Sequence, residues 1–134
     1  MSEIKFRAWH KGNEEMALVK TIDFIREVAT LGYFSGRKNN GTKFEWLELM
    51  QYTGLKDKNG VEGFADDIVK AGKDELFKIG WFEDTASWIL TGLETGKVRW
   101  IECRENFCLN DFQINFNECE VIGNIYENPE LLNK

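Results

Sequence analysis

The chain has 134 residues, of which 43% are hydrophobic and 13% aromatic, a composition that excludes an intrinsically disordered protein. This length predicts one domain over residues 1–134, with residues 1–60 and 61–134 as a possible subdivision. The net charge of −6 divides into −1 for residues 1–67 (ten Lys and Arg, eleven Asp and Glu) and −5 for residues 68–134 (seven and twelve), which counts against a nucleic-acid surface in the second half.

Neither the apolar runs nor the N-terminus indicates export or a membrane. No apolar run reaches the ~18 residues of a spanning helix, and the first residues lack the apolar block of a signal peptide. Cys103, Cys108 and Cys119 form no CxxC pair, which favours isolated thiols over a disulfide framework or a zinc site. We therefore expect a cytoplasmic protein with no cofactor, no metal and no membrane association.

The N-terminal residues predict a β-hairpin. Residues 4–9 alternate apolar and charged residues up to Trp9, which is typical of a half-buried strand. Residues 11–14 are typical of a turn, and residues 16–19 are apolar enough to return as the second strand.

Residues 21–31 carry two conflicting patterns. One face of a helix would hold the apolar residues Ile22, Ile25, Val28 and Ala29. Thr21 is a suitable N-cap and Gly32 a suitable stop. However, Ile, Val, Thr and Phe also favour strands. We expect a short helix between Thr21 and Leu31, and a strand remains the alternative.

The next segment predicts a polar loop from Gly36 to Lys43, followed by a strand from Phe44 to Thr53. The loop approaches the phosphate-binding pattern Gly-x-x-x-x-Gly-Lys-Ser/Thr. Here, however, Thr42 precedes Lys43 and the residues that follow are strand-like, so we do not predict a nucleotide site.

The same loop places three cations, Arg37, Lys38 and Lys43, between aromatic residues on both sides. Cationic contacts combined with base stacking hold single-stranded nucleic acids. A solvated loop flanked by core aromatics is the simpler interpretation, because a small charge cluster is a weak footprint. Nucleic-acid binding through these three residues is therefore the alternative and not the leading hypothesis.

Asp57-Lys58-Asn59-Gly60 is typical of a turn between strands, because Asn and Gly tolerate positive φ. A calcium loop with EF-hand spacing would put Leu55 in the first ligand place and Asp66 in the last, where a bidentate Glu is usual. We therefore expect a turn without metal, with Asn59 or Gly60 at positive φ. On this interpretation Gly60→Val costs about 1 kcal/mol or more, and Asp57→Ala costs a few tenths to ~1 kcal/mol.

Beyond residue 67, short apolar runs recur between turn signals. They cover residues 76–82, 88–93, 98–103, 107–116 and 120–122. Glu94-Thr95-Gly96 joins two of them as a hairpin, and Phe112, Ile114 and Phe116 alternate with polar residues as in a two-faced strand. Many short strands at this spacing predict a mainly β chain with a small barrel or sandwich in its C-terminal half.

The sequence predicts no catalytic constellation. His10 is the only histidine, and we expect an exposed ring or a turn cap. Asp66 and Asp67 are adjacent, so on a strand they would point to opposite faces and would not share a site. Core or subunit-interface positions are favoured over a ligand cage for the tryptophans of three separate strand segments, Trp81, Trp88 and Trp100.

Three blocks of the chain resemble the YopX family of bacteriophage and prophage proteins. They are EIKFRAW at residues 3–9, LMQYTGLKDKNG at residues 49–60 and EVIGNIYENPEL at residues 120–131. The resemblance implies a mainly β, self-associating phage or prophage protein with no established activity. The family's Gly-Asp-Ile-Val resembles the first strand of an SH3-like barrel, and Asp66 stands here in place of that Gly. Asp tolerates left-handed φ better than most residues, though less well than Gly.

The leading hypothesis is therefore a non-enzymatic binding or regulatory module in the cytoplasm of the host cell. Its expected partners are further copies of itself and a phage or host protein that the sequence does not identify. The alternative is a nucleic-acid-binding module of phage replication or transcription control.

Overall fold

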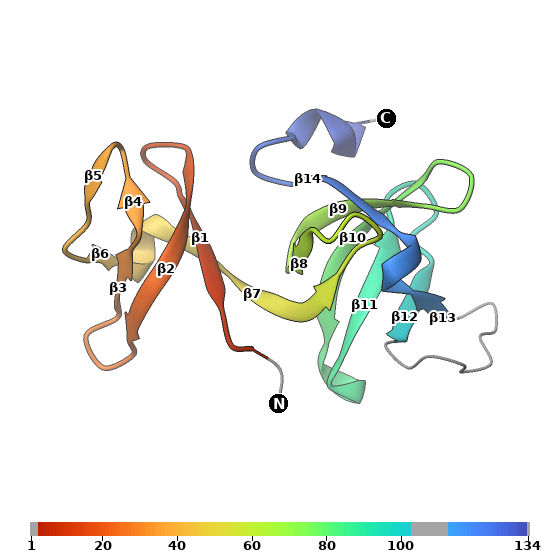
Figure 1. Ribbon diagram of the computed structural model, residues 1–134, viewed down its shortest axis with the longest axis horizontal. Coiled ribbons are helices and arrows are strands. Elements are labelled where there is room, and N and C mark those ends of the chain that lie inside the picture. The colour runs from red at the N-terminus through yellow and green to blue at the C-terminus, as the bar shows by residue number, and fades with distance from the viewer. Residues whose placement is uncertain (1–2, 103–112, 134) are drawn as a thin grey trace. The chain divides into compact units, whose positions relative to one another are not determined.

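The computed structural model describes residues 3–102 and 113–133, and this part of the chain is mainly β, as predicted (Figure 1). The chain forms two compact units, Met1–Tyr52 and Thr53–Lys134. The expected single domain over residues 1–134 stays a prediction. None of the helices in the described ranges is long and apolar enough to cross a membrane.

The first unit begins with the expected β-hairpin. Strand β1 (Phe6–His10) pairs antiparallel with β2 (Glu15–Asp23), and Trp9 lies opposite Met16. The backbone N–H of Asn13 donates to Nδ1 of His10 at 3.0 Å, so the imidazole caps the connecting turn. The capped turn predicted for His10 is confirmed.

The helix expected between Thr21 and Leu31 is wrong. Strand β2 continues to Asp23, and β3 (Val28–Leu31) returns antiparallel to it. Oδ1 of Asp23 accepts hydrogen bonds from the backbone N–H groups of Ile25 and Arg26, each at 3.0 Å, and this side-chain turn competes with a helix. Residues 28–31 follow the strand alternative, because Ala29 and Leu31 are buried and alternate with less buried residues with a period of two.

The segment expected as one polar loop contains short strands. Strands β4 (Tyr33–Phe34) and β5 (Arg37–Lys38) form a separate two-stranded sheet, and β6 (Thr42–Lys43) pairs with β3. The strand expected from Phe44 is confirmed from Leu47 onward. A 3₁₀ turn η1 (Phe44–Trp46) precedes β7 (Leu47–Lys56), which pairs with β1 and continues into the second unit.

Three of the five buried residues in the hydrophobic cluster of the first unit are alanines. Its buried members are Ala8, Ala17, Ala29, Leu31 and Leu47. Ala8 and Ala17 face each other across the β1–β2 pair. Alanine buries little apolar area per residue, so this core contributes less hydrophobic stabilisation than one built of large side chains.

The second unit is a curled half-barrel of short strands, as expected for the C-terminal half (Figure 1). The sheet order is β13-β12-β11-β10-β9-β14, and only the β12–β13 pair is parallel. The strands are β9 (Asp67–Ala71), β10 (Glu75–Phe82), β11 (Ser87–Gly92), β12 (Val98–Glu102), β13 (Gln113–Asn115) and β14 (Glu120–Asn124). Phe112 and most of the run 107–116 lie outside the described residues.

The described part of the second unit also contains three 3₁₀ turns and one further strand. They are η2 (Glu83–Thr85), η3 (Phe116–Glu118), η4 (Pro129–Asn133) and β8 (Glu62–Phe64), which pairs with the end of β7. The expected Glu94–Gly96 hairpin joins β11 to β12, with the N–H of Gly96 donating to the carbonyl of Gly92 at 2.9 Å.

Large side chains fill the core of the second unit. Phe77 and Ile79 of β10 are 1% and 0% exposed, and they pack with Phe116 and Leu90. Gly63 of β8 lies directly against this core, since a Cβ at that position would come within 2.6 Å of Cζ of Phe116. The glycine therefore makes room for a buried aromatic ring.

Asp66 adopts a left-handed φ of 68° just before β9. Its N–H donates to the carbonyl of Ile79 at 2.9 Å, and its Oδ2 accepts from the hydroxyl of Tyr126 at 3.1 Å. These hydrogen bonds hold a conformation that costs a non-glycine residue free energy. The chain thus enters the half-barrel through a left-handed Asp and not through a Gly.

Candidate functional site

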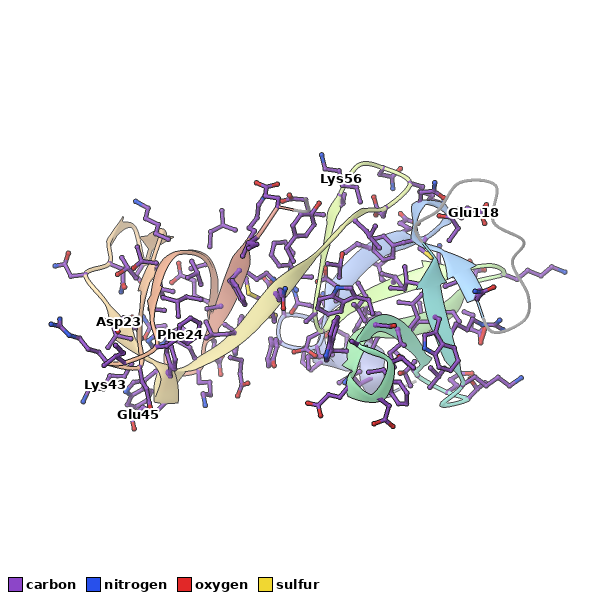
Figure 2. The ribbon with its side chains drawn as sticks, turned by 90° about the horizontal axis from the view of Figure 1, so that it is seen from below. Asp23, Phe24, Lys43, Glu45, Lys56 and Glu118 are labelled. Carbon is purple, nitrogen blue, oxygen red and sulfur yellow. The ribbon has the colours of Figure 1, made fainter. Side chains whose placement is uncertain are left out.

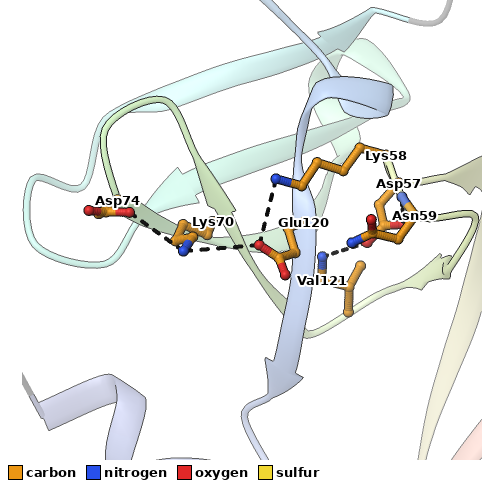
Figure 3. A network of polar contacts seen from close by, with 7 residues as sticks. All are labelled: Asp57, Lys58, Asn59, Lys70, Asp74, Glu120 and Val121. Carbon is orange, nitrogen blue, oxygen red and sulfur yellow. Dashed lines mark hydrogen bonds and ion pairs between the residues drawn. The ribbon is translucent and has the colours of Figure 1, made fainter.

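The turn between β7 and β8 is organised by the buried side chain of Asp57 (Figure 3). Its Oδ1 accepts from the N–H groups of Asn59 and Val61, each at 2.8 Å. Its Oδ2 accepts from the N–H of Val121 in β14, also at 2.8 Å. Gly60 has φ +79°, so the predicted turn with Gly60 at positive φ is confirmed. Asp57 therefore ties the turn to a strand far along the chain.

Gly60→Val should destabilise the fold by about 1 kcal/mol or more, because a β-branched residue resists left-handed φ. Nothing lies within 4 Å of a Cβ built at Gly60, so the cost is backbone strain and not a clash. Urea denaturation of both proteins measures it, and addition of calcium should raise the melting temperature of neither. An unchanged midpoint for Gly60→Val would contradict the strain argument.

A row of exposed ion pairs extends from Lys58 of this turn to Asp74 (Figure 3). Nζ of Lys70 lies 3.5 Å from Oδ1 of Asp74 and 4.0 Å from Oε2 of Glu120, and Nζ of Lys58 lies 3.8 Å from the same Glu120 oxygen. Side chains this exposed and this far apart contribute about 0–1 kcal/mol per pair. Their main consequence is that Lys70 and Asp74 are partly neutralised.

A groove of about 820 Å³ opens on the second unit beside these ion pairs. It is formed by the turns that follow β9 and β11, by β14 and by η4. Its apolar lining consists of Leu76, Leu93, Ile122, Leu131 and Leu132. Its charged lining consists of Lys70, Lys73, Asp74, Glu75 and Glu94. Sequence reasoning missed the groove, because its lining comes from four separate segments.

The β2–β3 turn of the first unit carries two exposed apolar side chains, which we call the apolar tip. Phe24 is 73% exposed and Ile25 is 96% exposed. The ring of Phe24 meets that of Phe44 edge to face, with centroids 6.3 Å apart. Sequence reasoning assigned Ile25 to the buried face of a helix, and the structure instead presents it to solvent.

The three cations proposed for nucleic-acid binding lie in two different sheets. Arg37 and Lys38 form β5, which pairs with β4, and Lys43 belongs to β6, which pairs with β3. The side chains of Arg37 and Lys38 are outside the described part of the molecule. Lys43 is exposed, at the same end of the first unit as Phe24 (Figure 2).

The residues 36–43 also lack the architecture of a phosphate loop. Thr42 and Lys43 form a strand, and only the three-residue turn η1 follows them, so no α-helix presents its amides to a phosphate. Within residues 3–102 and 113–133, no three His, Cys, Asp or Glu side chains are grouped as metal ligands.

The adjacent aspartates have separate structural roles. Asp67 is 1% exposed and its Oδ2 accepts from the N–H of Phe64 at 2.8 Å, whereas the carboxylate of Asp66 contacts Tyr126. These two hydrogen bonds join the carboxylates to different donors, and the expectation that the two aspartates share no site stays a prediction.

The tryptophans of the half-barrel differ in exposure. Trp81 is 51% exposed and meets Trp88 edge to face at 5.1 Å, and Trp88 packs against the core. Trp100 of β12 meets Phe82 of β10 edge to face at 6.1 Å, although β11 lies between these two strands in the sheet. The core role is confirmed for Trp88, and an interface role for Trp81 stays a prediction.

Cys119 is a buried thiol, 0% exposed, whose Sγ donates to the carbonyl of Asn115 at 3.7 Å. Burial, together with the negative charges of Glu118 and Asp57, raises the pKa of Cys119 from 9.0 to about 11. The thiolate is the nucleophilic form, so this environment suppresses reactivity. The prediction of an isolated buried thiol is confirmed for Cys119; Cys103 and Cys108 lie outside the described residues.

In a Cys103→Ser, Cys108→Ser background, native Cys119 should react with iodoacetamide far more slowly than the unfolded chain at pH 8. The raised pKa also predicts that the free energy of unfolding depends on pH. As pH rises, the thiol ionises in the unfolded chain before it does so in the native chain. The stabilisation from the protonated native thiol is therefore present below pH 9 and lost as pH rises through about 11. Cys119→Ala should remove this alkaline component. Equal alkylation rates for the native and unfolded chain would contradict the burial argument.

These features define a small, mainly β protein of two compact units, the second of them a curled half-barrel. The profile of the YopX protein family matches residues 5–133, and the chain belongs to this family. It is similar to the crystal structure of protein EF1440 from Enterococcus faecalis, with 28% sequence identity over 98% of this chain and 99% of that chain and a TM-score of 0.60. A comparison with curated proteins finds no match.

Proposed function

We propose that this YopX family member is a binding or regulatory module that assembles with copies of itself and catalyses no reaction. A phage or prophage encodes it, on this proposal, and it acts in the cytoplasm of the host cell on a phage or host protein. The observation that carries the proposal is the apolar tip, since side chains such as Ile25, 96% exposed, gain stability when a partner covers them.

Groups that often perform chemistry are engaged in holding this fold, which supports binding over catalysis. The carboxylate of Asp57 accepts from three backbone N–H groups. The thiol of Cys119 is buried and its pKa is raised, and Nδ1 of His10 accepts from a turn amide. An acid, base or nucleophile must instead reach its substrate.

Light scattering on the full chain tests the self-association. We expect a mass that is a multiple of the monomer at tens of micromolar and falls on dilution. A clean monomer at that concentration would sink the self-association, and turnover of nucleotides or nucleic acid with divalent metal would overturn the non-enzymatic part.

A second candidate function is nucleic-acid binding through Lys43. Its exposed ammonium lies at the same end of the first unit as the exposed ring of Phe24, and Trp46 nearby is 51% exposed. Cations beside exposed aromatic rings are the elements of single-strand binding.

A labelled single-stranded oligonucleotide at low salt tests this candidate. Binding should weaken as salt rises, and Lys43→Glu should reduce both the affinity and the salt dependence. Lys97→Glu, an exposed lysine of the second unit, is the matched control. Absence of binding at low salt discards the candidate.

A further inference from the structure

We propose that the apolar tip of one copy docks into the groove of the second unit of another copy, so that the chains assemble head to tail. This inference rests on the proposed self-association and names the two surfaces that meet. The site is formed between two molecules, each of which contributes a different surface.

The apolar tip is a preorganised projection. Oδ1 of Asp23 holds the backbone N–H groups of Ile25 and Arg26 at 3.0 Å, and Glu27 closes the turn at φ 55°. A turn that is already ordered loses little conformational entropy when it binds. Phe24 and Ile25 are therefore suited to act as anchors.

The groove offers an apolar surface of suitable size. Its volume of about 820 Å³ lies within the range of about 300–1,000 Å³ that is typical of pockets enclosing a ligand. Five leucine and isoleucine side chains line it, and one of them, Leu132, is 44% exposed. Two adjacent apolar side chains on a narrow turn can enter such a groove, whereas a flat surface cannot.

The charges of the two units favour a head-to-tail contact. The first unit, residues 1–52, has eight Lys and Arg against seven Asp and Glu, a net charge of +1. The second unit, residues 53–134, has nine against sixteen, a net charge of −7. A contact between two second units would bring −7 against −7, whereas a first unit meets a second unit without this repulsion.

Charges at the two surfaces are complementary as well. Glu75 and Glu94 of the groove have no ion-pair partner among the described residues. The side chain of Arg26 is 83% exposed. Its ion pair with the carboxylate of Asp23 is long at 3.8 Å, so the guanidinium stays accessible to a partner. Docking the tip would bring this guanidinium to a groove whose charged lining, Lys70 and Lys73 against Asp74, Glu75 and Glu94, has a net charge of −1.

The test uses two variants of the full chain. Ile25→Asp alters the tip, and Leu132→Asp alters the groove. The matched controls are Leu18→Asp, 60% exposed in the first unit, and Val61→Asp, 45% exposed in the second. All four changes replace exposed side chains, and circular dichroism checks that each variant is folded.

Light scattering should find the parent and both controls assembled, and each of the two test variants monomeric or at least about tenfold weaker in association, because anchors carry most of the binding energy of an interface. An equimolar mixture of the two test variants should form a 1:1 dimer, because one copy retains a tip and the other retains a groove.

Other outcomes separate the two proposals. A monomeric parent overturns the self-association and this inference with it. A parent that assembles while Ile25→Asp assembles equally well overturns the docking alone. A mixture that stays monomeric also overturns it and points to contact between like surfaces.

A charge exchange gives an independent measurement. Arg26→Glu and Glu94→Arg should each weaken association, and mixing the two variants should restore it, since the exchanged charges meet across the interface. Additive weakening in the mixture would count against the proposed pairing.

Discussion

Replacing Asp57 by alanine should lower the free energy of unfolding by about 3 kcal/mol or more, well above the ~1 kcal/mol expected from the turn sequence alone. The variant loses three hydrogen bonds to a carboxylate, and it leaves the N–H groups of Asn59, Val61 and Val121 without that acceptor. Hydrogen bonds to charged groups contribute about 1.5–3 kcal/mol each, and partial access of water to the emptied site reduces their sum.

Urea denaturation measures this effect through a lower midpoint at an unchanged slope. Asp57→Asn retains an oxygen acceptor but presents an N–H₂ group to one donor, so it should fall between the parent and Asp57→Ala. Asp84→Ala is the matched control, since that side chain is exposed in the same unit at an ordinary φ and should change stability by less than about 0.5 kcal/mol. A loss below 1 kcal/mol for Asp57→Ala would show that the three hydrogen bonds matter little.

Gly63→Ala should destabilise the protein by about 2–3 kcal/mol, although alanine is usually the better residue. The added Cβ would come within 2.6 Å and 2.9 Å of ring carbons of Phe116, a side chain that is 1% exposed and cannot move aside. The surrounding core is close-packed, so either the ring or β8 must shift.

Thermal or urea denaturation of a double-mutant cycle tests this clash. Phe116→Leu removes the ring edge, so Gly63→Ala should cost much less in that background. Gly80→Ala in β10 is the control, because nothing lies within 4 Å of its Cβ, and it should be neutral or slightly stabilising. Equal costs of Gly63→Ala in both backgrounds would reject the steric explanation.

Local patterns predicted much of this fold. The alternation of residues 4–9, the Asn59-Gly60 pair and the turn at Glu94–Gly96 each specify structure within a few residues, and each prediction is confirmed. The helix predicted between Thr21 and Leu31 is wrong, because the residues there are compatible with both a helix and a strand. Asp23 favours the turn between two strands, because its carboxylate accepts hydrogen bonds from the backbone N–H groups of Ile25 and Arg26.

Other features depend on residues that meet only after folding. Asp57 was recognised as a turn residue, but its bond to Val121 joins residues 64 positions apart, and no local signal indicates it. The local sequence does not indicate the role of Gly63 either, because this glycine leaves space for the ring of Phe116, a residue far along the chain. The groove and the apolar tip were missed for the same reason, because exposure is set by the tertiary structure.

The alanine-rich core of the first unit has a consequence for amide hydrogen exchange. Ala8, Ala17 and Ala29 bury little area, whereas Phe77 and Phe116 of the second unit bury much more. Local opening should therefore need less free energy in the first unit than in the second. Strand β7 belongs to both, so its backbone deuterium uptake should slow from Leu47 toward Lys56, recording the difference within one continuous strand.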